Sequence, residues 1–209
     1  MNILIVGATR GIGRQVLEQA LASGDSVTAV VRDPQRLATR HERLRVVKGD
    51  ILDANSVAAA MDGQNAACCS IGVKAPWPII TVFSEGTKNL LRAMKQAGVK
   101  RLICVTGIGA GDSRGHGGFF YDRVFYPLVA RPIYADKDRQ ESLIRASDVD
   151  WTIVRPGFLT NGPLTKSYRA LTNLTGVTAG WISRADVAHF ILTELRSNQY
   201  LKQAPLLTS

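Results

Sequence analysis

The stretch Asn2-Ile-Leu-Ile-Val-Gly-Ala-Thr-Arg-Gly-Ile-Gly-Arg14 decides the fold of this chain. Residues 2–6 form a short apolar run rich in branched side chains, which is typical of a buried parallel strand. Glycines follow at positions 7, 11 and 13, and residues 14–22 carry apolar side chains at helical spacing. Such a turn lets a pyrophosphate approach the backbone, and the helix N-terminus attracts its charge. The order strand, glycine turn, helix therefore favours a nucleotide site over an ordinary strand–helix connection.

Strand and helix patterns alternate along the rest of the chain. Further strands are expected at residues 26–31, 44–48, 66–70, 101–106, 151–155 and 205–208. Helices are expected at residues 53–61, 79–97, 135–146 and 184–196, with Asp53 and Gly98 as caps. This alternation predicts an α/β fold with a single Rossmann-type, doubly wound parallel sheet and helices on both faces. The length suits one domain covering residues 1–209.

Two segments, at about residues 107–134 and 157–184, interrupt the alternation. Both follow predicted strands at their carboxyl ends, where ligands bind in open α/β sheets. We therefore expect these segments to form the wall of a site for a small-molecule substrate. The aromatic stretch from Phe119 to Tyr134 has three open interpretations: it lines the pocket, packs on the core or forms a dimer face. A monomer and a homodimer both remain compatible with the sequence.

The amino-acid composition indicates which classes of binding partner the chain can have. The chain carries 26 Lys and Arg against 17 Asp and Glu, a net charge of +9. The basic residues are scattered without a dense run, so they favour anionic cofactors and substrates over nucleic acid. The lack of a long apolar stretch or a signal peptide predicts no membrane association and a cytoplasmic location. Cys68, Cys69 and Cys104 lie in apolar runs and are expected to be buried thiols. No metal site is expected.

A set of motifs in a fixed order covers nearly the whole chain. They are GATRGIG at 7–13, VVRDP at 30–34, GDILD at 49–53, VTG at 105–107, Lys137 with Glu141, DWTIVRPGFLTNGP at 150–163 and ISRADVA at 182–188. In these motifs the chain resembles the short-chain dehydrogenase/reductase superfamily. Within it, the chain is similar to the atypical NmrA-like, flavin-reductase (biliverdin-reductase-B)-like branch. Arg10 stands where that branch usually has a glycine.

The preferred cofactor follows from charge. NAD-specific sheets place a carboxylate at the end of the second strand to bind the ribose 2′-hydroxyl, and here that position holds Arg32. Arg32 and Arg10 suit a 2′-phosphate, so NADP(H) is preferred over NAD(H), unless Arg32 merely ends a strand on a basic surface. The resemblance further implies that Asp50 contacts the adenine and that residues 70–72 line the nicotinamide-side ribose. The full predicted cofactor-binding set is Gly7, Thr9, Arg10, Gly11, Ile12, Gly13, Arg32, Asp50, Ile51, Ser70, Ile71, Gly72, Thr106, Gly107, Lys137, Pro156, Gly157 and Phe158.

The sequence contains only part of the superfamily's catalytic residue set. In the superfamily's common Tyr-x-x-x-Lys mechanism, the tyrosine donates a proton and the lysine holds the nicotinamide ribose. Lys137 matches that lysine, but Ile133 stands at the tyrosine position. Tyr134, three residues before Lys137, is expected on a neighbouring helix face if the helix already starts there, and it is not taken as the acid. The candidates are therefore Lys137, Thr106 and the loop residue His116, with water or the substrate as other proton sources.

Thr106 has two interpretations: its hydroxyl faces the nicotinamide, or it bonds its own backbone. Glu141 is expected to pair with Lys137 or a neighbour. Without the usual tyrosine, the resemblance implies a reductase for acceptors that take hydride readily, such as flavins, quinones, extended tetrapyrroles or small carbonyl compounds. The runner-up is a protein that senses NADP(H) without turnover.

Two further functions are disfavoured. Residues 111–115 match the G-x-S-x-G motif of serine hydrolases, but Ser113 lies beyond a glycine-rich stretch and not on a sharp strand–helix turn. A nucleotide-sugar epimerase would need the missing tyrosine and usually a larger carboxyl-terminal domain.

Overall fold

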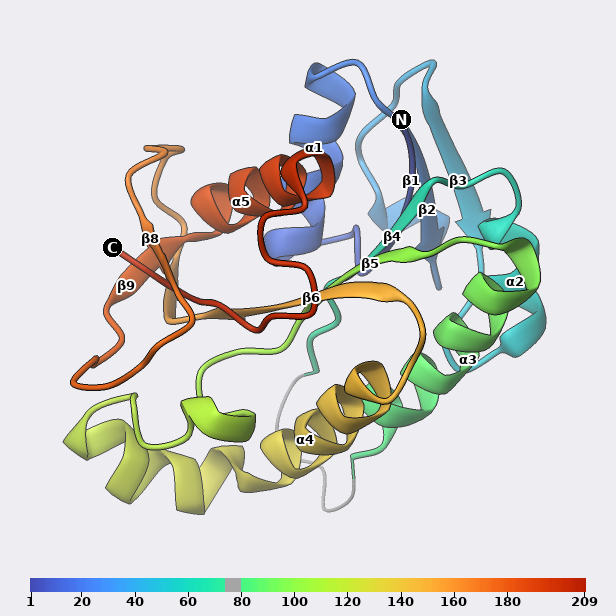
Figure 1. The fold of residues 1–209 in the computed structure, drawn as a ribbon. Coiled ribbons are helices and arrows are strands. Elements are labelled where there is room, and N and C mark those ends of the chain that lie inside the picture. The colour runs from blue at the N-terminus through green and yellow to red at the C-terminus, as the bar shows by residue number, and fades with distance from the viewer. Residues whose placement is uncertain (74–79) are drawn as a thin grey trace.

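The computed structural model describes residues 1–73 and 80–209, and its centre is an eight-stranded sheet (Figure 1). In order across the sheet, the strands are β3 (Leu44–Lys48), β2 (Ser26–Val31), β1 (Asn2–Val6), β4 (Ala66–Cys69), β5 (Arg101–Val105), β6 (Asp150–Pro156), β10 (Leu206–Thr208) and β8 (Arg169–Leu171). Neighbours pair in parallel except β10 and β8, which are antiparallel. The order reverses between β1 and β4, which is the topological switch point of a doubly wound sheet.

Helices cover both faces of the sheet. They are α1 (Gly11–Ala22), α2 (Ala54–Met61), α3 (Val82–Ala97), α4 (Arg131–Arg145) and α5 (Arg184–Ser197). Figure 1 shows α1 and α5 side by side on one face and α2, α3 and α4 on the other. The predicted Rossmann-type fold is confirmed.

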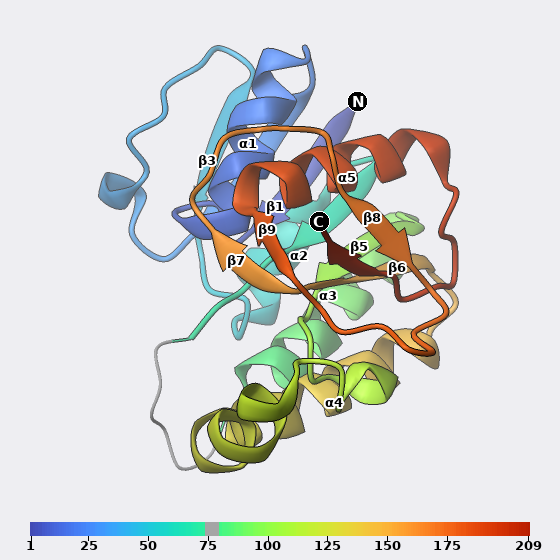
Figure 2. The same ribbon diagram turned by 90° about the vertical axis from the view of Figure 1, so that its left-hand side faces the viewer.

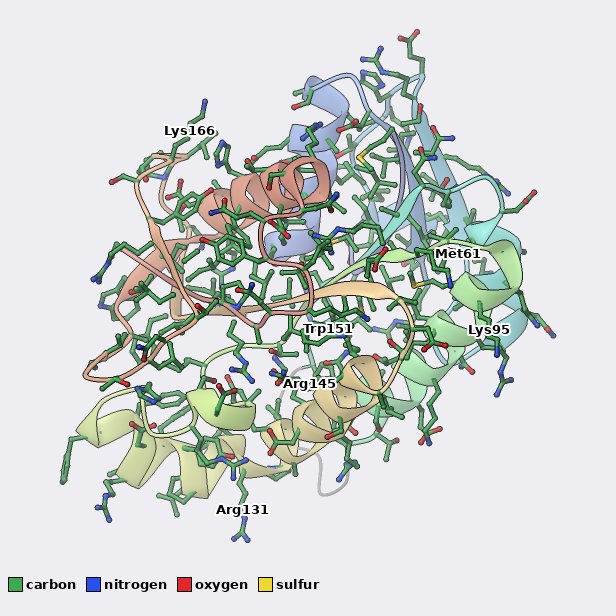
Figure 3. All side chains as sticks on the ribbon, viewed as in Figure 1. Met61, Lys95, Arg131, Arg145, Trp151 and Lys166 are labelled. Atoms are coloured by element: carbon green, nitrogen blue, oxygen red, sulfur yellow. The ribbon has the colours of Figure 1, made fainter. Side chains whose placement is uncertain are left out.

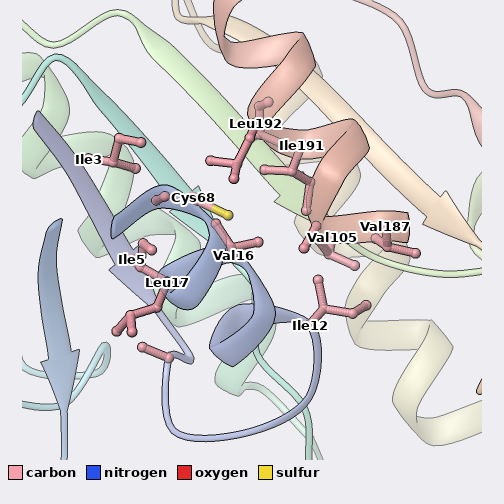
Figure 4. Close-up of a cluster of buried hydrophobic side chains, with 14 of the residues drawn as sticks. Ile3, Ile5, Ile12, Val16, Leu17, Cys68, Val105, Val187, Ile191 and Leu192 are labelled. Atoms are coloured by element: carbon pink, nitrogen blue, oxygen red, sulfur yellow. The ribbon is translucent and has the colours of Figure 1, made fainter. Parts of the chain in front are cut away.

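The core has two apolar layers because successive strand residues point to opposite faces. Ile3 and Ile5 of β1 pack beneath α1 and α5, whereas Leu4 and Val6 belong to the layer under α2, α3 and α4. Figure 4 shows the first layer, in which Val16 of α1 lies between the sheet and α5. The three cysteines are free and buried, with Cys68 and Cys69 in opposite layers as expected.

Most predicted element ends lie within a few residues of the observed ones. Asp53 caps α2 by accepting the N–H of Asn55 at 3.0 Å, and Gly98 ends α3 at a φ of +70°, as predicted. The predicted first residue of the third helix, Ile79, lies outside the described residues. In the structure α3 begins at Val82, and Thr81 occupies the N-cap position without a side-chain hydrogen bond.

The first interrupting segment is more helical than expected. A short 3₁₀ turn, η2 (Gly111–Ser113), is followed by a π-helix, η3 (Tyr121–Ala130), which runs directly into α4. Helix α4 therefore begins four residues before the predicted position 135. Pro132 is accommodated because the first turn of a helix needs no N–H from it. Pro127 lies inside the π-helix and hides the helical pattern in the sequence.

The second interrupting segment contains strands that the sequence pattern does not reveal. β7 (Phe158–Thr160) and β9 (Trp181–Ser183) pair in parallel as a separate small sheet, and β8 joins the edge of the main sheet (Figure 2). Each has three residues, which is too few to show an alternating pattern.

Cationic side chains also cover apolar surface away from the sheet edge. The Arg145 guanidinium stacks over the Trp151 ring, 5.2 Å from its centroid, and Figure 3 labels the pair between α4 and β6. Across residues 1–73 and 80–209, no helix combines the length and hydropathy that a membrane span requires. Those residues also hold no group of three or more His, Cys, Asp or Glu side chains able to bind a metal.

Candidate cofactor and substrate site

The glycine turn lies at the carboxyl end of β1 and fits tightly against its surroundings. A Cβ at Gly7, where φ is +97°, would lie 2.2 Å from the Ser70 carbonyl oxygen. A Cβ at Gly13 would lie 2.3 Å from the Gly7 carbonyl oxygen. These two glycines let α1 pack close to β1 and β4, whereas Gly11, at φ +61°, meets only a side chain. The nearest atom to a Cβ there would be Nε of Arg184, at 3.9 Å, so the Arg184 side chain lies against this part of the turn.

Arginine side chains lie around this turn. Arg10 precedes α1 in an extended conformation, and its Nη2 donates to the Gly72 carbonyl at 3.2 Å. Arg32 is exposed directly after β2, the strand next to β1. Both residues therefore lie at the carboxyl edge of the sheet, where the 2′-phosphate site is expected.

Other predicted cofactor residues follow neighbouring strands. Asp50 is half-buried after β3 and accepts the N–H of Leu52 at 3.0 Å. Ser70 follows β4 and donates its N–H to Val6. Ile12 and Ile51 are buried in the core, so only their backbones are available to a ligand.

The Thr106 hydroxyl makes a hydrogen bond that neither interpretation of the sequence predicts. Its buried hydroxyl does not bond its own backbone but donates to Oε1 of Glu141 at 2.8 Å. The carbonyl of Thr106 instead accepts a hydrogen bond from Nζ of Lys137. Thr106 therefore contributes to the site through its backbone carbonyl, because its side chain is bound to Glu141 of α4.

Glu141 is neutralised by Arg155 of β6. Two parallel hydrogen bonds join them, Nε to Oε1 at 3.0 Å and Nη2 to Oε2 at 2.6 Å. Arg155 is 1% exposed and also donates to Oδ1 of Asp112 at 2.6 Å. Arg145, one helical turn after Glu141, approaches Oε2 at 3.7 Å as well. Glu141 is thus paired with two arginines, and its carboxylate accepts the Thr106 hydrogen bond and fixes that side chain.

Tyr134 and Lys137 converge over Gly107. A Cβ at Gly107 would lie 3.0 Å from the Tyr134 hydroxyl oxygen and 3.7 Å from Lys137 Nζ. The helix already includes Tyr134, because α4 begins at Arg131. Side chains three residues apart on a helix lie close together, so Tyr134 on its neighbouring face reaches Gly107 together with Lys137. Glycine at 107, with φ of +136°, leaves the space that both polar groups enter.

Burial shifts the pKa values of Tyr134 and Lys137 in opposite directions. Burial raises the pKa of Tyr134 well above its usual value, and the neighbouring Tyr121 raises it further. Burial lowers the pKa of Lys137 to about 8, although nearby Cys104 and Glu141 oppose the change. At neutral pH the phenol is therefore protonated, and the amine titrates just above neutrality.

His116 has a different environment from the one expected of a free loop residue. Its Nδ1 lies 2.8 Å from the Val177 carbonyl, and its own carbonyl accepts the N–H of Ala179. The half-buried histidine thereby joins the two interrupting segments. Tyr134, and not His116, is the side chain that meets Lys137 over Gly107.

Ser113 is not placed as a nucleophile. It is fully buried in η2, where its hydroxyl donates to the Ala110 carbonyl at 2.6 Å and accepts the N–H of Gly109 at 3.1 Å. A hydrolytic serine must be exposed on a strained turn, so this geometry argues against the hydrolase alternative.

An aromatic row connects the two interrupting segments. The rings of Phe125 and Tyr121 are 5.6 Å apart, those of Tyr121 and Phe158 are 5.3 Å apart, and those of Phe158 and Trp181 are 5.3 Å apart. The Tyr121 hydroxyl donates to the Ile108 carbonyl at 3.1 Å, which fixes the row above the loop that follows β5. Pro156 and Gly157 bring Phe158 to the end of β6, where the N–H of Gly157 binds the Leu207 carbonyl.

The sequence model of a family described as NAD(P)H-binding matches residues 7–198. The chain belongs to this NAD(P)H-binding family. The resemblance to atypical short-chain dehydrogenases/reductases is thereby confirmed.

This NAD(P)H-binding protein is similar in sequence and in structure to several other proteins. It is 30% identical over 177 residues to an uncharacterised chloroplast protein of Arabidopsis thaliana, covering 78% of this chain and 61% of the relative's length. It is 27% identical to the uncharacterised sugar epimerase YhfK of Bacillus subtilis, covering 93% of this chain and 88% of YhfK. Among solved structures, ChuY, an anaerobillin reductase from Escherichia coli O157:H7, superposes with a TM-score of 0.85 at 26% identity, covering all of this chain and 97% of ChuY.

Proposed function

We propose that this protein is an NADP(H)-dependent reductase of the atypical short-chain type. The observation that carries the proposal is the convergence of the Tyr134 phenol and the Lys137 amine over Gly107, at the carboxyl end of β5. An acid and a cationic group at the ligand edge of a nucleotide-binding sheet have the chemistry that carbonyl or conjugated acceptors require. The reductase name of ChuY is consistent with this function.

Each part of the cofactor has its own binding residues. In this proposal the turn at residues 7–13 holds the pyrophosphate, Arg32 and Arg10 bind the 2′-phosphate, and Asp50 contacts the adenine. Residues 70–72 and Lys137 face the nicotinamide ribose. The bound cofactor supplies a hydride to the acceptor.

Tyr134 supplies the proton in this scheme. Its raised pKa keeps the hydroxyl protonated at neutral pH, so it can donate a proton to the atom of the acceptor that gains negative charge. The adjacent amine of Lys137, whose Nζ lies 5.4 Å from the Tyr134 ring centroid, stabilises the phenolate that remains. Solvent then returns a proton to Tyr134. This role replaces the expectation that excluded Tyr134 as the acid.

The aromatic row indicates the class of acceptor. Phe125, Tyr121, Phe158 and Trp181 present ring surface between the two interrupting segments, and Trp181 is 63% exposed. Flat conjugated molecules such as flavins, quinones or tetrapyrroles stack on such surfaces, so they are favoured over small aliphatic carbonyl compounds.

The test is to mix the protein with NADPH and a panel of flavins, quinones, tetrapyrroles and aldehydes and to follow the loss of NADPH absorbance. Turnover of a flat acceptor is expected. Tyr134→Phe should slow it by roughly a hundredfold while leaving NADPH affinity unchanged, because the variant loses only the proton donor. Ile133→Leu, next to Tyr134 on the same helix, is the matched control.

Two results would contradict the proposal. Tight NADPH binding without turnover of any acceptor would favour the sensing function. Unchanged turnover in Tyr134→Phe would remove Tyr134 from the reaction and return the proton donor to water, the substrate or His116.

A further inference from the structure

A hollow of about 280 Å³ lies beside the glycine turn, where α1 and α5 begin. Its lining comes from three parts of the chain that are far apart in sequence. The lining residues are Arg10, Gly11, Arg14, Gln15, Glu18, Asn161, Gly162, Arg184 and Ala185. Three guanidinium groups and a single carboxylate therefore face this space.

The charges in the hollow are unevenly balanced. Arg14 is paired with the one carboxylate, since its Nε lies 2.8 Å from Oε1 of Glu18. The other two arginines bind neutral acceptors: Arg10 the Gly72 carbonyl, and Arg184 the Oδ1 of Asn161 at 2.8 Å. Across the part of the chain that the structure describes, neither Arg10 nor Arg184 forms a salt bridge. The hollow is consequently suited to an anion.

Arg184 is the best placed of the three. It is the first residue of α5 and half-buried, and its Nε is the nearest atom to a Cβ built on Gly11. Its side chain thus lies over the glycine turn at Gly11, and both residues line the hollow. Asn161 holds the other end of the guanidinium, which reduces the conformational entropy lost on binding an anion.

We propose that Arg184 binds the pyrophosphate of the dinucleotide and is a cofactor-binding residue that belongs to α5. The inference rests on the proposed function, because it takes a dinucleotide as the ligand. It separates two recognition tasks: Arg32 reads the 2′-phosphate that only NADP(H) has, whereas Arg184 binds a group common to both cofactors.

The first experiment measures the affinities of NADPH and NADH by calorimetry, without any acceptor. Arg184→Gln keeps most of the side-chain volume and loses the charge. It should weaken both cofactors by the same factor, roughly tenfold to a hundredfold, as expected for the loss of a charge-assisted hydrogen bond. Arg184→Lys should recover part of the loss. A loss confined to NADPH would overturn the assignment, because it would make Arg184 a reader of the 2′-phosphate.

A second variant separates binding from loop support. Asn161→Ala removes the bond between Asn161 and Arg184 but leaves the positive charge in the hollow. If Arg184 binds the pyrophosphate, Asn161→Ala should cost no more than a few-fold in affinity. Equal losses in Asn161→Ala and Arg184→Gln would overturn the inference and make Arg184 a support for the loop. Arg169→Gln, an exposed arginine on β8, is the control for net charge.

Ligand fragments provide the final distinction. ADP-ribose contains the pyrophosphate without the 2′-phosphate, and 2′-AMP contains the 2′-phosphate without the pyrophosphate. Arg184→Gln should weaken ADP-ribose and leave 2′-AMP unchanged, and Arg32→Gln should do the reverse. Unchanged binding of ADP-ribose in Arg184→Gln would refute the inference while the proposed function stands. If the unmodified protein binds neither NADPH nor NADH, both the proposed function and this inference fail.

Discussion

Arg32 is an exposed side chain whose predicted role depends on one chemical group of the cofactor. Replacing it with aspartate reverses the charge at the end of β2. NADPH affinity should fall by a hundredfold or more, on the order of 3 kcal/mol, because the 2′-phosphate then meets a carboxylate. NADH affinity should change less or improve, since a carboxylate there binds the ribose 2′-hydroxyl. Fluorescence titrations of both cofactors test this, and equal losses would refute the 2′-phosphate assignment.

The lowered pKa of Lys137 predicts that the free energy of unfolding depends on pH. Its pKa in the folded chain, about 8, lies below the ordinary value of 10.5 because of burial. Between these two values the unfolded chain binds the extra proton, so the contribution of Lys137 to stability rises with pH across that window. Below pH 8 the buried ammonium costs up to ~3 kcal/mol.

The comparison of unmodified protein with Lys137→Met isolates this effect from other titrating groups. Urea unfolding at several pH values should show the variant relatively most stable near neutrality and its advantage shrinking as the pH rises toward 10.5. A difference in the free energy of unfolding that is independent of pH would contradict the lowered pKa of Lys137.

At the scale of elements, α4 supplies the cap of its neighbour α3. The carboxylate of Asp136 is fully buried and accepts the N–H groups of Phe83 and Ser84, and Arg139 pairs with it from the exposed side. Asp136→Ala should cost roughly 2 to 4 kcal/mol, because it leaves the first turn of α3 without acceptors. Urea denaturation measures the loss, and Asp148→Ala, an exposed residue beyond the end of α4, is the control. Equal stability of the two variants would show that α3 does not depend on this cap.

The elements also show where a sequence pattern is sufficient. The central strands of the main parallel sheet are buried on both faces, so they appear as largely apolar runs, and the predictions for β1 to β6 hold. The edge strand β3 is only half-buried. The π-helix η3 could not be predicted in the same way. It contains Pro127, and its Tyr121 is held by Phe158, a residue from a different segment.

At the scale of the whole molecule, the net charge of +9 acts on an anionic cofactor before contact. Raising the ionic strength from low to high should lower the affinity for NADPH on the order of tenfold, and the affinity for NADH less, because NADPH carries the additional phosphate. Titrations of both cofactors over a salt series measure the two slopes. Identical slopes would indicate that the 2′-phosphate is not bound through charge.

The sequence by itself determined the doubly wound sheet, the glycine turn and the arginines at its edge. These features depend on local order along the chain: an apolar run, glycines at fixed spacing and the residue that ends a strand. The tertiary structure decided which polar groups meet. It turned the Thr106 hydroxyl toward Glu141, brought Tyr134 and Lys137 together over Gly107, and placed Arg184 beside Gly11. These contacts join residues from separate elements, or depend on where a helix begins, so no local pattern in the sequence specifies them.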